Sequence, residues 1–419
     1  MASGRFHILV LGAGIVGVAT ALQLARRGHA VALVDRRAPG RETSHGNAGI
    51  IQREAVVPYA FPRQWPALID AALRRGAAVN WHLRALPGLA APLARYWWHS
   101  APARHRRIAD DYARLIAHCQ DEHAALLHDS EAEPLLRRDG FRIVFRTPAA
   151  LAEAVAHADD VARRYGVRHA VLDGAALASA EPALRPGLAG ALHWLDPWTV
   201  SDPGELVRRY AQRFRRLGGE LHLGDATSLQ PDGAGWRVRT AHGALKARHA
   251  VIALGPWSAA LTQRLGYRLP LFVKRGYHRH FGAAADRPSL QLPLLDAERG
   301  YVLAPMARGI RLSTGAEFAR LGAPPSPVQL QRALQAARGL LPLGEPVDDE
   351  IWLGNRPCTP DMKPVIGSAP KHPGLWFNFG HAHQGFTLGP VSGRLIADMI
   401  DGVPPLVDAG AFSPARFAA

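Results

Sequence analysis

Cysteines and long apolar runs are scarce in this sequence. The two cysteines, Cys119 and Cys358, form no C-x-x-C pair, so we expect neither a disulfide framework nor a metal site. No apolar run approaches the roughly 20 residues that a membrane-spanning helix needs. The first predicted strand begins at His7, which leaves no room before it for a signal peptide. We therefore expect a cytoplasmic protein, with peripheral attachment to the inner face of the cell membrane left open.

Lysine is also scarce, with Lys246, Lys274, Lys363 and Lys371 as the only lysines among 50 basic residues. The formal net charge is nevertheless +15, because arginine is abundant. These arginines are spread along the chain, whereas a nucleic-acid groove concentrates its charge on one face. We therefore expect no nucleic-acid partner.

The N-terminal segment contains three glycines in the order G-x-G-x-x-G, between an apolar run and a stretch of helical periodicity. Gly12 permits a tight turn, Gly14 lets the backbone approach a pyrophosphate, and Gly17 lets the helix pack closely on the strand. The free N–H groups at the helix start favour phosphate. A second apolar run ends at Asp35, which is placed to accept ribose hydroxyls and disfavours the 2′-phosphate of NADP. The segment predicts a dinucleotide-binding βαβ unit for FAD or NAD, with an ordinary glycine turn as the alternative.

The pattern of strands and helices predicts a chain that leaves the nucleotide domain twice and returns twice. We expect an α/β fold with a Rossmann-like, glutathione-reductase-like FAD-binding domain and an interleaved α+β substrate domain on a mostly antiparallel sheet. The expected FAD-binding domain comprises residues 1–80, 203–268 and 354–403. The substrate domain comprises 81–202 and 269–353, and 404–419 form a C-terminal tail.

Three segments together resemble a known family: the N-terminal glycine motif, "ETSHGNAG", and "NRPCTPDMKPVIGS" followed by "FNFGHAHQGFTLGPVSGRLIADMI". They look like the D-amino-acid-oxidase superfamily of FAD oxidoreductases, and specifically its bacterial D-amino-acid-dehydrogenase branch. The segments "KRGYHRHF" and "VVPYAFP" are similar to the glyphosate-oxidoreductase-like members of that branch. The resemblance extends over nearly the whole chain.

The resemblance implies a set of residues that bind FAD. They lie in the glycine loop, a following polar loop, the adenine side and the start of a C-terminal helix: Gly12, Gly14, Ile15, Val16, Gly17, Asp35, Arg36, Thr43, Ser44, Asn47, Ala48, Gly49, Ala226, Gly255, Trp257, Gly380, His381, Gly385, Phe386 and Thr387. Independently of the resemblance, free N–H groups at that helix start stabilise negative charge on a reduced flavin. Covalently flavinylated relatives carry a cysteine near Cys358, but its spacing to Thr-Pro-Asp differs here, so we expect non-covalent FAD.

The resemblance also implies catalytic candidates. Arg356, in "GNRP", matches the position at which relatives bind the substrate carboxylate, which a planar guanidinium pairs with bidentately. Tyr277 and Tyr301 would cover the flavin or bond the carboxylate, with core aromatic packing as the alternative. The remaining candidates are histidines that shape the pocket or accept a proton, or else simply pack: His45, His278 and His383.

The resemblance implies oxidative deamination, in which a D-amino acid gives up a hydride to flavin N5 and the imino acid hydrolyses to a 2-oxo acid and ammonia. One alternative is oxidation of N-substituted glycines or cyclic imino acids, and another is a non-catalytic FAD-carrying subunit of a larger oxidoreductase. The expected electron acceptor is a quinone or an electron-transfer partner. The aromatic and basic segment 93–107 would then contact a membrane, or it would form a packed helix of the substrate domain.

Overall fold

The computed structural model describes residues 6–74, 76–284 and 288–417. Among them, eight strands form a first sheet in the order β12-β11-β10-β2-β1-β13-β22-β21. The five strands from β10 to β22 are parallel, and β11, β12 and β21 are antiparallel to their neighbours. The bounds are β1 Ile8–Leu11, β2 Val31–Asp35, β10 Glu220–Asp232, β11 Gly235–Thr240, β12 Gly243–Ala247, β13 His249–Ile252, β21 Val365–Ser368 and β22 Leu375–Phe379.

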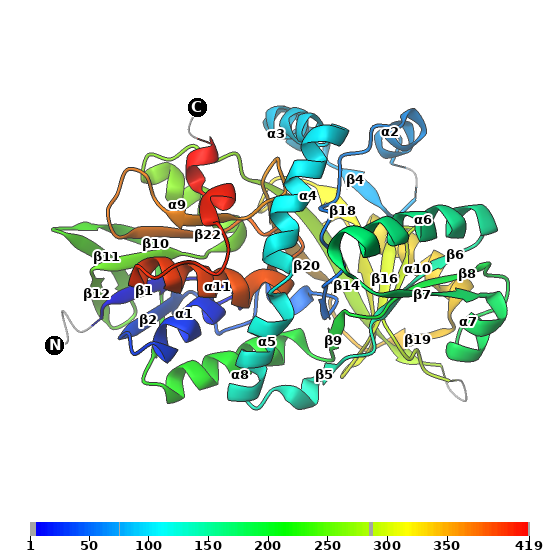
Figure 1. Ribbon diagram of the computed structural model, residues 1–419, viewed down its shortest axis with the longest axis horizontal. Helices are drawn as coiled ribbons and strands as arrows, with labels where there is room; N and C mark the ends of the chain where they lie inside the picture. The colour runs from blue at the N-terminus through cyan, green and yellow to red at the C-terminus, as the bar shows by residue number, and fades with distance from the viewer. Residues whose placement is uncertain (1–5, 75, 285–287, 418–419) are drawn as a thin grey trace.

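Apolar helices cover this first sheet. The helices α1 (Ile15–Arg26) and α11 (Gly385–Asp401) approach each other closely, because a Cβ at Gly393 would lie 2.8 Å from the Thr20 backbone nitrogen. Two further helices, α4 (Pro102–Ile116) and α5 (Cys119–Asp129), bury apolar side chains in the same core, beside α8 (Pro203–Arg216). Figure 1 shows α4 and α5 crossing the middle of the molecule, and α9 (Ser258–Arg264) lies near the outer strands.

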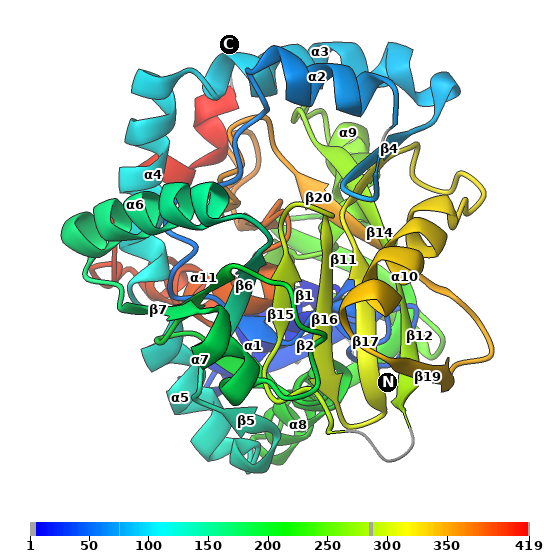
Figure 2. The ribbon, with the colours of Figure 1, turned by 90° about the vertical axis from the view of Figure 1, so that its right-hand side faces the viewer.

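A second, mostly antiparallel sheet lies on the other side of the molecule (Figures 1 and 2). Within the described ranges its strand order is β4-β18-β14-β17-β16-β15-β6-β8-β7, and β19 and β20 also pair with β14. The bounds are β4 Val79–Trp81, β6 Phe141–Phe145, β7 His169–Asp173, β8 Gly190–Trp194, β14 Phe272–Ala283, β15 Leu294–Asp296, β16 Tyr301–Met306, β17 Gly309–Thr314, β18 Ala316–Phe318, β19 Leu343–Pro346 and β20 Trp352–Cys358.

The remaining elements flank this sheet or connect the two sheets. A small sheet joins β3 (Ile50–Ile51), β9 (Trp198–Val200) and β5 (Leu136–Arg137). The helices α6 (Pro148–Tyr165), α7 (Gly174–Ala180) and α10 (Val328–Leu340) lie beside the second sheet (Figure 2). The helices α2 (Trp65–Ala72) and α3 (Leu86–His99) lie together at the top of both views, beyond the sheets.

This arrangement confirms the predicted fold class, a Rossmann-like α/β unit with an interleaved, mostly antiparallel second sheet. The exact domain boundaries stay a prediction. Two contacts cross them: β4, which spans the predicted boundary after residue 80, pairs with β18 of the second sheet, and α4 and α5, assigned to 81–202, pack against the first sheet's helices. Between α2 and α5 the chain is mostly helical, with β4 between α2 and α3.

Candidate functional site

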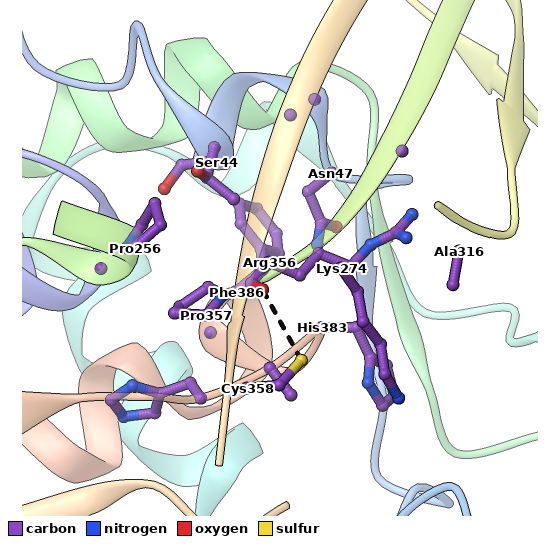
Figure 3. Close-up of a pocket in the computed structure, with 18 of the residues that line it drawn as sticks. Ser44, Asn47, Pro256, Lys274, Ala316, Arg356, Pro357, Cys358, His383 and Phe386 are labelled. Carbon is purple, nitrogen blue, oxygen red and sulfur yellow. Dashed lines mark hydrogen bonds between the residues drawn. The ribbon is translucent and has the colours of Figure 1, made fainter. Parts of the chain in front are cut away.

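A cavity of about 830 Å³ extends from the carboxyl ends of β1 and β2 to the facing strands β14 and β20. Parallel strands of such a sheet commonly bind ligands at this edge. Figure 3 shows Ser44 and Pro256 on one side of the cavity, and Lys274, Arg356 and His383 gathered on the other. Thus residues from the two sheets face one shared space.

The glycine loop borders one end of this cavity. Gly12 has a φ of +106°, and a Cβ there would lie 2.4 Å from the Ala253 carbonyl oxygen. A Cβ at Gly17 would lie 1.8 Å from the Gly12 carbonyl oxygen, so Gly17 serves helix–strand packing and does not line the cavity. A Cβ at Gly14 would meet only the Ser44 hydroxyl, at 3.3 Å. Internal packing therefore permits a side chain at Gly14, and the cavity is what requires the open backbone.

Polar groups surround the start of α1. The Ser44 hydroxyl accepts a hydrogen bond from the Ile15 backbone N–H at 2.9 Å and keeps its own proton to donate. The Asp35 carboxylate accepts from the Ala13 N–H at 2.6 Å and from the Arg37 N–H at 3.0 Å. Each carboxylate oxygen has two lone pairs, so Asp35 retains acceptor capacity toward the cavity that it lines.

The adenosine candidates lie farther along the same wall. The Arg36 guanidinium stacks 4.4 Å from the centre of the Trp257 ring, and both line the cavity. Gly255 starts a short turn there with a φ of +54°, and Ala226 on β10 is buried beside it. These residues form a flat, partly cationic surface suited to an adenine ring and a phosphate.

The polar loop after β2 contains residues that line the cavity and a glycine that shapes the backbone instead. Thr43, Ser44, Asn47 and Ala48 line the cavity. Gly49 does not: its φ of +72° and the Val200 carbonyl, 2.3 Å from an ideal Cβ, give it a backbone role.

The start of α11 closes another side of the cavity. His381, Gly385 and Phe386 line it. Gly380 and Thr387 do not, because Gly380 makes a turn with a φ of +82° and the Thr387 hydroxyl accepts from the Gln52 N–H at 3.1 Å. Burial lowers the pKa of His381 to about 3, so its imidazole is neutral at pH 7.

Arg356 faces the opposite end of the cavity from β20. Its guanidinium lies across Gly276, where a Cβ would come within 2.5 Å of Nη2. It donates to the backbone carbonyls of Gly315, at 2.8 Å, and Thr314, at 3.2 Å. In the described part of the chain no carboxylate pairs with it. Arg356 is therefore a cation that faces the cavity without a counter-ion.

His383 lies on the same side and also lines the cavity. Burial, followed by the charges of Arg356 and Lys274, lowers its pKa to about 3. Its ring lies 4.7 Å from that of Tyr59. Of the three histidine candidates, His383 alone combines a neutral imidazole with a position on the cavity wall.

For His45 and His278 the sequence left open a role in the pocket, proton acceptance or simple packing, and neither lines the cavity. The His278 ring stacks on Trp352 at 4.7 Å, and the His45 ring lies 6.2 Å from Trp352. Trp352 itself lines the cavity. Burial lowers the pKa of both histidines, and their rings pack behind the indole, outside the cavity lining.

The two tyrosine candidates line the cavity, and of the two only the Tyr277 hydroxyl has hydrogen-bond partners among the described residues. The Tyr277 hydroxyl donates to Glu317 at 2.8 Å and accepts from the Ser326 N–H at 2.7 Å, so it is not free to bond a substrate carboxylate. Tyr301 is buried, and burial with the nearby Asp296 raises its pKa. Tyr301 thus remains a wall residue with a protonated hydroxyl.

Several cavity residues were not predicted from sequence. Lys274, Gln52, Tyr96 and Trp352 all line the cavity. Lys274 had one available signal, because it is one of four lysines in an arginine-rich chain. The other three carry no sequence pattern that separates them from core residues.

The residues at the β1 and β2 edge fit a dinucleotide with a flavin. The open backbone at Gly14, the acceptor capacity of Asp35 and the Arg36–Trp257 surface follow one another along the cavity, and the α11 helix start adds free N–H groups farther along. The described residues contain no group of three metal-ligating side chains. No helix in the described ranges is long and apolar enough to cross a membrane.

Comparisons with known proteins agree with this site. Residues 7–399 match the family model described as FAD dependent oxidoreductase. The chain is 31% identical to a D-amino acid dehydrogenase of Chromohalobacter salexigens, over 99% of this chain and 100% of the relative. A glycine oxidase from Geobacillus kaustophilus has a TM-score of 0.74 at 24% identity, covering 98% of this chain and 99% of that one.

An iminodiacetate oxidase from Chelativorans sp. has a TM-score of 0.71 at 20% identity, and the match covers 97% of this chain and 99% of that one. The two solved structures share the fold, and the family model and the dehydrogenase identify the chemistry. FAD is therefore the cofactor of this chain. The chain belongs to the FAD-dependent oxidoreductases of the D-amino-acid-oxidase superfamily.

Proposed function

We propose that this FAD-dependent oxidoreductase deaminates D-amino acids oxidatively, with a 2-oxo acid and ammonia as products. The observation that carries the proposal is Arg356, a guanidinium that faces the cavity without a carboxylate partner in the described chain. A carboxylate is the anion that all amino acids share, and it matches the two-donor fork of arginine. The similarity to a D-amino acid dehydrogenase supports the choice of D-amino acids.

The chain's own residues would bind and orient the substrate. Arg356 would hold the carboxylate at one end of the cavity, and Trp352, Tyr301 and Phe386 would exclude water around the α carbon. The neutral imidazole of His383 would accept a hydrogen bond from the substrate amine and so orient it over the cavity. When bound, FAD supplies the acceptor for the hydride that leaves the α carbon. Water then adds to the imine and releases ammonia.

A second candidate is oxidation of secondary amines such as N-substituted glycines. The shared fold of an iminodiacetate oxidase supports it, and Arg356 would bind those carboxylates equally well. The two candidates differ in product, because an N-substituted glycine oxidised at its glycine carbon gives glyoxylate and a primary amine.

Product analysis separates these candidates. The holoenzyme would be supplied with an artificial dye acceptor and a D-amino acid, an L-amino acid or an N-alkyl glycine. The proposal expects ammonia and the matching 2-oxo acid from D-amino acids in equal amounts. Glyoxylate from N-alkyl glycines, with no turnover of D-amino acids, would favour the second candidate.

We expect the flavin to be held without a covalent bond. The Cys358 thiol lines the cavity, but burial raises its pKa and keeps it protonated, and it donates to the Arg356 carbonyl at 3.6 Å. A protonated thiol is a poor nucleophile. Acid precipitation of the holoenzyme should therefore leave all yellow colour in the supernatant.

An exposed aromatic patch on α2 and α3 favours delivery of electrons at an anionic membrane. We define the aromatic patch by the exposed large side chains of α2, α3 and the segment between them: Trp65, Ile69, Leu73, Leu83, Trp97 and Trp98. Arg63 and Arg104 stack on its tryptophan rings. Tryptophan and arginine together suit the interface of an anionic bilayer. A membrane quinone is then the expected acceptor.

Sedimentation with vesicles tests this contact. The protein should pellet with vesicles containing phosphatidylglycerol and remain in solution with pure phosphatidylcholine. Replacing Trp65 and Trp98 by serine together should abolish pelleting without loss of FAD, because both are exposed. Equal recovery with both kinds of vesicle would remove the membrane from the proposal.

A further inference from the structure

Lys274 lies directly opposite Arg356 in the second sheet. The two residues are Cα partners between the antiparallel strands β14 and β20. Side chains at such positions point to the same face, with their Cβ atoms about 5 Å apart. Both line the cavity, and Figure 3 shows them side by side. One wall of the cavity therefore presents two basic side chains, and burial together with the charge of Arg356 lowers the pKa of Lys274 where no anion is bound.

Like charges directly opposite each other destabilise a sheet unless an anion balances them. Among the described residues no carboxylate pairs with Lys274. Its ammonium donates to the Tyr96 hydroxyl at 3.2 Å and lies 4.3 Å from the centre of that ring. This environment accommodates a cation through the ring face but does not neutralise it.

The two charged ends diverge within the cavity. The Arg356 guanidinium crosses Gly276 toward the carbonyls of Thr314 and Gly315. The Lys274 ammonium reaches the other way, toward Tyr96 on α3. A single small carboxylate would balance the charge of only one of these two side chains. A molecule with two anionic groups joined by a short chain would balance both charges.

We infer that Lys274 is a specificity-determining residue that binds a second anionic group, so that the substrate class is amino acids carrying a second acid group. The inference rests on the proposed function for the position of the first carboxylate at Arg356. The second carboxylate belongs either to the side chain, as in D-aspartate and D-glutamate, or to a nitrogen substituent, as in iminodiacetate. Amino acids with a neutral side chain leave the Lys274 ammonium without a counter-ion and therefore bind more weakly.

The test uses three variants of the holoenzyme. Lys274→Met removes the charge and keeps the length of the side chain, and Lys274→Arg keeps the charge. Lys246→Met is the matched control, because Lys246 is exposed and pairs with Asp232 on the outer hairpin. Retained flavin absorbance and an unchanged melting temperature establish that each variant is folded.

Two measurements are made on each protein. The first is the dissociation constant of glutarate and of butyrate, followed through the visible spectrum of the bound flavin. The second is kcat/KM for D-glutamate, iminodiacetate and D-alanine with a dye acceptor. The wild type should bind glutarate at least 10-fold more tightly than butyrate and should prefer one of the two acidic substrates over D-alanine. That substrate identifies the source of the second carboxylate.

In Lys274→Met both preferences should be lost, a fall of at least about 10-fold, as expected when one partner of a buried charge pair is removed. Lys274→Arg should retain most of each preference, and Lys246→Met should retain all of it. An equal loss for glutarate and butyrate in Lys274→Met would overturn the inference and assign both cations to one carboxylate. Equal binding of the two acids by the wild type would overturn it even if no variant folds.

The binding measurement separates this inference from the proposed function. If no amino acid is turned over, the proposed function fails, yet the preference for glutarate over butyrate and its loss in Lys274→Met would still support a site for two anions. If amino acids are turned over without any acidic preference, the proposed function stands and the role of Lys274 fails.

Discussion

Arg356 places a guanidinium deep in the protein with only backbone carbonyls as partners. An unpaired charge away from water costs several kcal/mol, which proteins accept where a ligand supplies the counter-charge. The carbonyls of Gly315 and Thr314 orient the group but cannot neutralise it. At the residue scale this uncompensated cation is the strongest indication of a carboxylate-bearing substrate.

Removing this charge should damage substrate binding but not cofactor binding. Arg356→Ala should keep its FAD, because the glycine loop lies at the other end of the cavity. It should lose about 2–5 kcal/mol of transition-state binding, measured as the change in kcat/KM for the best amino acid. Arg356→Lys should recover only part, since an ammonium lacks the planar fork. Unchanged kcat/KM in the alanine variant would place the carboxylate elsewhere.

Sequence patterns located some site residues and misjudged others for physical reasons. The positions of Gly12, Gly14 and Asp35 follow from local spacing, so they could be predicted without a structure. The role of the Tyr277 hydroxyl depends on Glu317, 40 residues farther along the chain, and such long-range pairing leaves no local pattern. The contact of His278 with Trp352 likewise depends on strand register, so local sequence could not decide between its packing and pocket roles.

At the element scale, the β14–β20 pair makes room for the site through two facing glycines. Gly276 and Gly354 are Cα partners, and a Cβ on either would collide with Arg356 or with Trp352. Trp352 in turn lies against Gly46 of the polar loop. The two glycines thus determine the positions of the Arg356 guanidinium and the Trp352 indole, although a glycine has no functional side chain.

Gly276→Ala should therefore displace the guanidinium without altering its charge. The added Cβ would lie 2.5 Å from Nη2, so we expect kcat/KM to fall by at least about 10-fold, or 1.4 kcal/mol, while FAD is retained. Gly282→Ala is the matched control on the same strand, because its Cβ would lie 3.8 Å from the nearest neighbour. Steady-state kinetics on both variants would decide, and equal effects would contradict this role for Gly276.

Three neutral histidines surround the start of α11 and link stability to pH. Burial lowers the pKa of His381 and His383 to about 3 and that of His123, which bonds the Phe386 carbonyl, to about 4. The unfolded chain takes up these protons near pH 6.5, whereas the folded chain does not. Stability is therefore fully present above pH 6.5 and is lost as the pH falls toward 4, by up to about 1.4 kcal/mol per pH unit for each histidine.

Denaturant unfolding between pH 7 and pH 5 measures this loss. His123→Gln should reduce the slope of stability against pH by about one proton's contribution. His157→Gln, on the exposed face of α6, is the control and should keep the wild-type slope. A wild-type slope of zero would contradict the neutral histidines.

At the scale of the whole molecule, the cofactor candidates and the substrate candidates come from different sheets. The chain crosses between the sheets several times, so that the polar loop, β14, β20 and α11 meet at one cavity. The Rossmann-like order and the antiparallel second sheet could be predicted, because strand and helix periodicities are local. The packing of α4 and α5 on the first sheet could not, because an apolar helix face does not specify its partner.

The choice of electron acceptor depends on the outer surface of the molecule as well as on the cavity. The exposed aromatic patch lies on α2 and α3, outside the sheets. We expect a quinone analogue to reoxidise the reduced enzyme at least 10-fold faster than oxygen does, measured by stopped-flow absorbance. Rapid formation of hydrogen peroxide in air would contradict this and indicate an oxidase.

Anaerobic reduction of the bound flavin tests the central claim most directly. The purified holoenzyme would be mixed without oxygen with D-amino acids, L-amino acids, N-alkyl glycines and amines that lack a carboxylate, and absorbance near 450 nm would be followed. We expect D-amino acids to bleach the flavin in the wild type, Arg356→Ala to slow this bleaching by roughly 30-fold or more, and amines without a carboxylate to be ineffective. A flavin that no amino acid bleaches would contradict the account and indicate a protein that carries FAD without amine oxidation.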